Sequence, residues 1–295
     1  TTSAARQWKK RRDHTGLVSD VIHRYLTGDD IADDPHQEPR RWIVDFGLRS
    51  LEEAMRYPAA LAIVRERVKP ERDGNARTAR RIRWWRFGEN AVGMRQAIGP
   101  LPRYIAGGAQ GKHLFFCWCT PDWCPSNLTN VFAFADPYSF GVLSSVVHEL
   151  WARRGEGKST LEDRPRYTPS TVFETFPWPN PPVPLRVEIG SIADEIETYR
   201  RELCLADGIG LTRLYNKMDE GAYEELRRFH ATLDTAVAAA YGWSSSILRD
   251  HEVLLQELVR LNFAITAGKQ PYDPFPASQR DTFPGARQLR IEIDA

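Results

Sequence analysis

The feature that most constrains the fold is a proline-rich segment, TFPWPNPPVP, at residues 175–184. Five of these ten residues are proline. Because proline lacks a backbone N–H and has a fixed φ, the segment cannot be the interior of a helix or a central strand. We therefore expect the architecture of the chain to change here. The flanking sequences agree, because short strands and helices are predicted before it and only helices after it.

Before the proline-rich segment, the sequence predicts a mixed α/β region. Short apolar runs favour strands at residues 41–47, 103–107, 113–119 and 130–135. Ser50, with Glu53 three residues on, forms a capping box that opens a helix, and Pro58 is expected to break or kink that helix. Asp136, followed by a proline, caps a further helix whose apolar stripe continues to Leu150.

After the proline-rich segment, apolar residues recur at helical spacing over residues 189–203, 223–237 and 248–261. This spacing predicts a bundle of three or four helices, and the residues from about 269 read as a tail. The expected fold class is α+β, a mixed α/β domain followed by a small all-α bundle. The expected parts are a linker at 1–40, the mixed domain at 41–179, the helical domain at 185–268 and the tail at 269–295.

Charge is distributed unevenly along a chain whose net charge is only +1. Residues 65–86 hold nine Arg or Lys and three Asp or Glu, whereas residues 185–264 hold nine against fourteen. The first region suits an anionic partner and the second suits water or a protein. If residues 75–86 are helical, Arg77, Arg81 and Trp84 share one face, and Trp85 lies on the face that packs on the core. A solvated helix over a core remains the alternative reading of this stretch.

The sequence does not predict chemistry carried by this chain alone. The cysteines of CWCTPDWC (117–124) and His113 are spaced as if for zinc, but no second ligand pair accompanies Cys204, so a buried strand is favoured. NPPV at 180–183 has Val183 where an aminomethyltransferase loop needs an aromatic residue. No apolar run is long enough to span a membrane, and the N-terminus lacks the core of a signal peptide. We therefore expect a cytoplasmic protein without metal or bound cofactor.

A series of segments resembles one known family. They are YLTGDDI (25–31), RWIVDFG (41–47), YPAALAIVRERVKPERD (57–73), RWWRFGE (83–89), LPRYIA (101–106), FGVLSSVVHELWA (140–152), DRPRYTPSTVFETFPWP (163–179) and LDTAVAAAYGW (233–243). In this order they resemble the C-terminal region of the large adenine-specific DNA methyltransferases of type IIL restriction-modification enzymes and of the BREX and DISARM phage-defence systems. The resemblance implies a target recognition domain followed by a helical domain.

The resemblance also implies what the chain lacks. Members of that family carry an S-adenosylmethionine site and an NPPY-type catalytic loop upstream of this region, and neither occurs here. We therefore expect sequence-specific binding of double-stranded DNA, with methyl transfer supplied by a missing N-terminal portion or by a partner subunit. The first residue is Thr1, which favours a piece of a longer protein. The alternative is a stand-alone DNA-binding or adaptor protein of a defence system.

The resemblance and the charge pattern together give candidate DNA-contacting residues. The base-reading loop of the family matches LEDRPRYTPST, where Glu162, Arg164 and Arg166 alternate along one edge of an extended strand, with Asp163 and Lys158 as weaker candidates. An ordinary charged turn is the alternative. SNLTN (126–130) is a second candidate for the groove. The predicted phosphate contacts are Lys69, Arg72, Arg77, Arg80, Arg81, Arg83 and Arg86, with Lys112 and His113 as possible additions.

Overall fold

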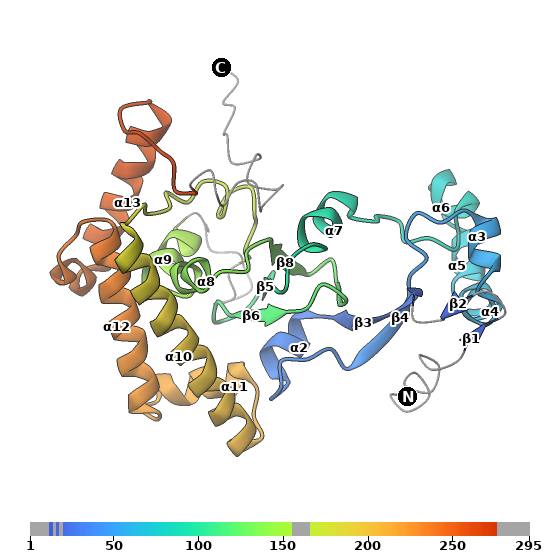
Figure 1. Cartoon of the computed structure of the whole chain (residues 1–295), viewed down its shortest axis with the longest axis horizontal. Coiled ribbons are helices and arrows are strands. Elements are labelled where there is room, and N and C mark those ends of the chain that lie inside the picture. Colours follow the sequence, from blue (N-terminus) through green and yellow to red (C-terminus); the bar gives the residue numbers. More distant parts are fainter. Residues whose placement is uncertain (1–11, 14–15, 18–19, 155–165, 276–295) are drawn as a thin grey trace. The chain divides into compact units, whose positions relative to one another are not determined.

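A computed structural model of the chain describes residues 12–13, 16–17, 20–154 and 166–275 (Figure 1). The chain divides into two compact units. Unit 1 comprises Thr1–Leu26, Pro39–Arg95 and Asp122–Cys124, and unit 2 comprises Thr27–Glu38, Gln96–Pro121 and Pro125–Ala295. Short sheets are combined with many helices, and the C-terminal region is helical. The predicted α+β class is confirmed.

Within the described residues, unit 1 combines small antiparallel ladders with several short helices. β3 (Ile22–Leu26) pairs with β4 (Arg41–Val44) in a sheet of order β4-β3-β7, where β7 is Cys124–Pro125, and β1 (Arg12–Asp13) pairs with β2 (Gly16–Leu17). The helices are α3 (Leu51–Met55), α4 (Pro58–Arg67), α5 (Lys69–Asp73) and α6 (Thr78–Ile82). The Ser50–Glu53 capping box is present and α4 begins at Pro58, so both predictions are confirmed.

The two adjacent tryptophans are buried in the opposite order from that expected. The helix predicted over residues 75–86 is only α6, and it ends at Ile82. Helical periodicity therefore does not reach the tryptophans. Trp84 is 8 % exposed and packs in the core with Phe46 and Leu61, whereas Trp85 is partly buried at its edge. The prediction that Trp85 is the core residue is wrong.

Unit 2 is built on a three-stranded antiparallel sheet of order β6-β5-β8, formed by β5 (Tyr104–Gly108), β6 (Phe116–Cys119) and β8 (Thr129–Phe132). α2 (Gly28–Asp33) precedes the sheet in the chain, and α7 (Val92–Ile98) has residues in both units. Cys117 and Cys119 are buried on β6, as the strand interpretation predicts. Among the residues that the structure describes, no group of three or more His, Cys, Asp or Glu side chains is arranged to hold a metal ion.

The helix predicted from Asp136 to Leu150 is two helices. Asp136 caps α8 (Pro137–Leu143) as expected, with its Oδ1 accepting from the Ser139 N–H at 2.8 Å. A second helix, α9 (Val146–Arg153), then begins after a new N-cap at Ser145. Asp234 also accepts from the Val146 N–H at 2.8 Å, so a distant carboxylate satisfies an amide that the continuous helix would have used internally.

The C-terminal helices pack on the strand-bearing part of unit 2. They are α10 (Val183–Asp207), α11 (Leu211–Asp219), α12 (Glu224–Ala240), the 3₁₀ helix η2 (Ser245–Arg249) and α13 (His251–Thr266). α10 packs against α8 and lies beside α12 (Figure 1). The polypeptide changes to helix at Val183, as the proline-rich segment predicts, but unit 2 extends across residues 175–184. None of the helices within the described ranges is long and apolar enough to cross a membrane.

Residues expected to be linker or tail also take part in the fold. β3 and α2 lie within residues 1–40. In the expected tail, the Tyr272 hydroxyl accepts from the Trp178 N–H at 3.0 Å and donates to the Phe176 carbonyl at 3.2 Å. Phe275 is 7 % exposed and stacks on Phe134. These contacts fasten the end of the helical region to the proline-rich segment and to the chain after β8.

The contact between α8 and α10 requires a glycine. A Cβ at Gly141 would lie 2.8 Å from Ile189 Cγ2 and 3.1 Å from Ala193 Cβ. We predict that Gly141→Ala lowers the free energy of unfolding by about 1–3 kcal/mol because the helices must move apart. Denaturant unfolding followed by circular dichroism measures this change. Gly93→Ala in α7 is the control, since a Cβ there meets nothing within 4 Å; equal losses in both variants would contradict the packing argument.

Candidate functional site

The predicted phosphate contacts all lie in one part of unit 1, the basic segment (residues 65–86). It comprises the end of α4, all of α5 and α6, and the turn that follows. Neither α5 nor α6 has a side-chain N-cap, and a proline lies in the first turn of both α4 and α5, so the chain turns repeatedly over a short distance. These cations differ in the contacts that they make within the protein.

Some cations of the basic segment are already engaged. Lys69 Nζ lies 2.6 Å from Asp73 Oδ2 in an i,i+4 ion pair. Arg81 Nη1 donates to the Asn75 carbonyl at 2.6 Å, and its Nη2 donates to Thr78 Oγ1 at 3.0 Å. These bonds hold the turn before α6, so Arg81 has a structural role in the unbound protein.

Arg86, Arg80 and Arg72 are also partly committed. Arg86 Nε donates to the Arg49 carbonyl at 2.8 Å, and its guanidinium lies 5.5 Å from the Trp85 ring. The Arg80 guanidinium covers Gly88 so closely that a Cβ there would be 2.8 Å from Arg80 Nε. Arg72 is half-buried. These three side chains are held against the protein surface.

Arg77 and Arg83 differ from the rest of the basic segment. Both residues are exposed, and within the described part of the chain neither side chain has a hydrogen-bond or ion-pair partner. Arg77 is the N-cap residue of α6 and Arg83 its C-cap residue. An unpaired guanidinium group on the surface is free to form charge-assisted hydrogen bonds with an external anion at no cost in internal contacts.

Of the predicted base-reading residues, only Arg166 lies within the described part of the chain. Glu162, Asp163, Arg164 and Lys158 lie outside the described residues. Arg166 is exposed, and its backbone forms an isolated antiparallel bridge with Gln110, which follows β5. The structure therefore places Arg166 at the end of the β6-β5-β8 sheet.

Hydrogen bonds fix the backbone next to Arg166. The Tyr167 N–H donates to the Ala109 carbonyl at 2.9 Å, and Asn130 Nδ2 donates to the Tyr167 carbonyl at 3.1 Å. Asn130 was expected to face a groove, but its amide is occupied here in bracing Tyr167. Asn127 and Leu128, from the same SNLTN segment, are exposed.

The side chain of His148 is hydrogen-bonded to the Tyr167 hydroxyl. It is fully buried, its Nδ1 donates to the Leu143 carbonyl at 2.9 Å, and its Nε2 accepts from the Tyr167 hydroxyl at 3.1 Å. A carbonyl can only accept, so the proton must be on Nδ1 of the neutral ring. Burial lowers the pKa of His148 to about 3. No sequence pattern connects this histidine with Tyr167, the residue after Arg166.

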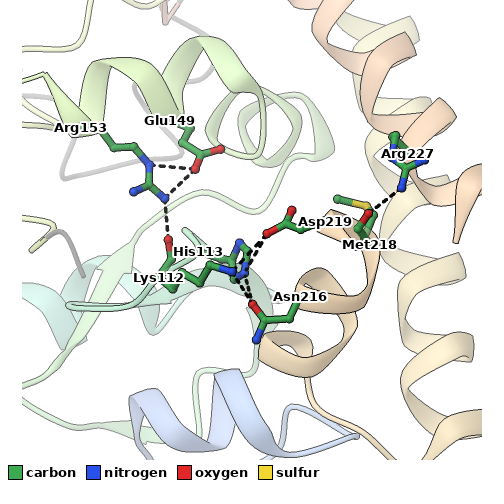
Figure 2. Close-up of polar contacts among 8 residues, drawn as sticks. All are labelled: Lys112, His113, Glu149, Arg153, Asn216, Met218, Asp219 and Arg227. Carbon is green, nitrogen blue, oxygen red and sulfur yellow. Dashed lines mark hydrogen bonds and ion pairs between the residues drawn. The ribbon is translucent and has the colours of Figure 1, made fainter. Parts of the chain in front are cut away.

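Lys112 and His113 are not free to contact phosphate. Figure 2 shows both side chains pointing to α11, where Asn216 Oδ1 lies 2.7 Å from Lys112 Nζ and 2.9 Å from His113 Nε2. Asp219 Oδ2 also accepts from Lys112 Nζ at 3.3 Å. These two residues therefore join the turn before β6 to the helical region.

A polar pocket of about 440 Å³ lies beside this junction. Its walls include Arg200 on α10, and His230 and Asp234 on α12. Burial raises the pKa of Asp234 to about 7 and lowers that of His230 to about 4, while His230 Nε2 lies 2.9 Å from the Tyr215 hydroxyl. These side chains are bonded to neighbouring helices and to β6, and within the described residues the pocket holds no arrangement of nucleophile, base and orienting group.

The protein has an α+β fold, and within the described residues Arg77 and Arg83 expose unpaired guanidinium groups on its surface. The chain belongs to the family of MmeI target recognition domains, whose family model matches residues 6–180. A solved structure, described as the type IIL restriction-modification enzyme MmeI in complex with DNA, matches with a TM-score of 0.69 and 22% sequence identity. The match covers 85% of this chain and 32% of that one, so the chain spans about a third of its length. Comparison with curated proteins gives no match.

The His148 environment makes stability depend on pH. The unfolded chain binds a proton near pH 6.5, whereas the folded chain does not protonate His148 until about pH 3. Acid therefore favours unfolding, by at most about 1.4 kcal/mol per pH unit in this window. We predict that the stability advantage of the wild type over His148→Gln shrinks as the pH falls from 6.5 towards 4. Urea unfolding at several pH values measures both proteins, and parallel pH profiles would contradict the prediction.

Proposed function

We propose that this chain is the DNA target recognition module of an S-adenosylmethionine-dependent adenine-N6 methyltransferase. Membership of the MmeI target recognition domain family carries the proposal. The parent system is a type IIL restriction-modification enzyme or a related phage-defence system of the BREX or DISARM kind. The methyltransferase domain, with its cofactor, acts in the same polypeptide or as a separate subunit.

The proposed function divides holding the duplex from reading it. A methyltransferase must rotate adenine out of the stack, so the recognition module has to grip the duplex meanwhile. Contacts with phosphate hold the duplex whatever its sequence. Bidentate contacts with base edges make binding depend on the sequence. We assign phosphate binding to the basic segment, chiefly to Arg77 and Arg83, since neither side chain has an internal partner among the described residues. Lys69, Arg72, Arg80, Arg81 and Arg86 are secondary phosphate contacts in this proposal.

We assign base choice to Glu162, Asp163, Arg164 and Arg166. Arg166 supports this assignment because it is exposed while the backbone beside it is fixed to Ala109 and Asn130. A fixed backbone lowers the entropic cost of presenting a long side chain to a base. The bidentate geometry of a guanidinium suits guanine O6 and N7.

Replacing the free arginines should weaken binding to every sequence. Arg77→Ala and Arg83→Ala each remove one phosphate contact, so the slope of log K against log salt should become shallower by about 0.9 per residue. Fluorescence anisotropy with several duplexes at increasing salt measures this. Arg228→Ala in α12 is a matched control, because Arg228 is also exposed but pairs with Glu225. An unchanged slope in both basic-segment variants would contradict the assignment.

Replacing the base-reading arginines should change sequence preference. Arg166→Ala and Arg164→Ala should each relax discrimination at one base pair, by about 1–3 kcal/mol, with little change in the salt slope. Selection from a randomised duplex library at two salt concentrations, for wild type and variants, gives both quantities. Uniform loss of affinity on all sequences would show that these residues hold DNA and do not read it. Absence of duplex binding by the wild type at low salt would overturn the proposed function.

A further inference from the structure

The turn that carries Gln110 is held by two sets of hydrogen bonds within unit 2, which we call its anchors. The turn comprises residues 109–113, follows β5, precedes β6 and includes Gly111. Gln110 is exposed and forms the bridge with Arg166. Such an exposed turn needs contacts from its neighbours to keep one conformation, since it contributes little to the core.

The first anchor comes from α9. Arg153 Nη2 donates to the Lys112 carbonyl at 2.6 Å, and the same guanidinium is held by Glu149 Oε1 at 2.7 and 2.9 Å (Figure 2). This bond fixes the backbone of the turn two residues after Gln110. Because Glu149 orients the guanidinium, little side-chain freedom remains in this contact.

The second anchor comes from α11, and Asn216 is its centre. Asn216 Oδ1 accepts from both Lys112 Nζ and His113 Nε2, at 2.7 and 2.9 Å (Figure 2). A carbonyl oxygen has two lone pairs, so one amide can hold both side chains at once. α11 is itself fastened to α12, since Arg227 Nη2 donates to the Met218 carbonyl at 2.6 Å. The turn is therefore attached to a braced helix.

Only a few residues and backbone contacts separate the second anchor from Arg166. Lys112 is two residues from Gln110, and the Gln110–Arg166 bridge is one residue from the bond between the Tyr167 N–H and the Ala109 carbonyl. Without the Asn216 bonds, the turn keeps only the Arg153 bond to the Lys112 carbonyl, so the backbone that sets the position of Arg166 is held less firmly. Recognition of a base edge requires donor positions accurate to about 0.5 Å, so a small release is enough to weaken discrimination.

We propose that Asn216 is a positioning residue for Arg166, and so takes part in base choice without touching DNA. This inference rests on the proposed function. Asn216 lies outside residues 6–180, the range matched by the recognition-domain model. The helical region is thereby a component of sequence discrimination, and its role is to hold the turn at residues 109–113 in the register that Arg166 needs.

The test compares Asn216→Leu with Asn216→Asp in the full chain. Leucine has a similar size but no acceptor, whereas aspartate keeps an oxygen that accepts from Lys112 and His113. Selection from a randomised library should show Asn216→Leu losing discrimination about two- to thirtyfold at the base pair that Arg166→Ala also affects. Asn216→Asp should retain it, and the salt slope should be unchanged in both.

Two further variants exclude a general structural effect. Lys217→Ala, on the same helix but bonded to Asp207, should keep the wild-type preference. In an Arg166→Ala background, Asn216→Leu should have no further effect on preference, because both act through one contact. If Asn216→Leu does not fold, Lys112→Met removes the exposed one of the two bonds to Asn216.

The outcomes separate this inference from the proposed function. Wild-type preference in Asn216→Leu or Lys112→Met, or additive effects with Arg166→Ala, would overturn the positioning role while the recognition function stands. Equal loss of affinity on all duplexes would also overturn it. A wild-type chain that binds duplex without any sequence preference would instead remove the proposed function on which the inference rests.

Discussion

Unit 2 depends on the contacts that the buried guanidinium group of Arg200 makes with a strand and with its own helix. Its side chain is almost fully buried on α10, where a charge away from water is tolerated only with partners. Arg200 Nη2 donates to the Phe116 carbonyl of β6 and pairs with Glu197 on its own helix. The first C-terminal helix is therefore bonded to the sheet through a charge that cannot be left unpaired. The proline-rich segment changes the secondary structure, yet it does not separate two independent cores.

Local features of the fold were predictable because they depend on neighbouring residues. The caps at Ser50 and Asp136 join groups three residues apart, and each was found as expected. The break between α8 and α9 was not predictable, because it depends on Asp234, 88 residues from Val146. The reversed burial of Trp84 and Trp85 has a similar origin, since α6 ends too early for helical spacing to apply. In the first case a long-range contact contributes to the break, and in the second the helix ends before the tryptophans.

The candidate sites show the same limit. Counting charges located the basic segment, but it could not show which arginines are free, because an acceptor such as the Arg49 carbonyl is 37 residues from Arg86. The resemblance supplied Arg166, whereas Gln110 and Asn216 carry no sequence signal that sets them apart. Asn216 lies more than a hundred residues from Lys112. The sequence therefore identified the charged residues, and only the fold showed which contacts each of them makes.

The residues on either side of positions 155–165 are bonded to other parts of the fold. Arg154 Nη1 donates to the Trp151 carbonyl at 2.6 Å and its Nη2 to Thr175 Oγ1 at 2.8 Å, while Tyr167 is held by His148. These contacts are made by residues that flank positions 162–164. Under the proposed function, the segment assigned to base reading therefore begins and ends at residues whose positions are set by the fold.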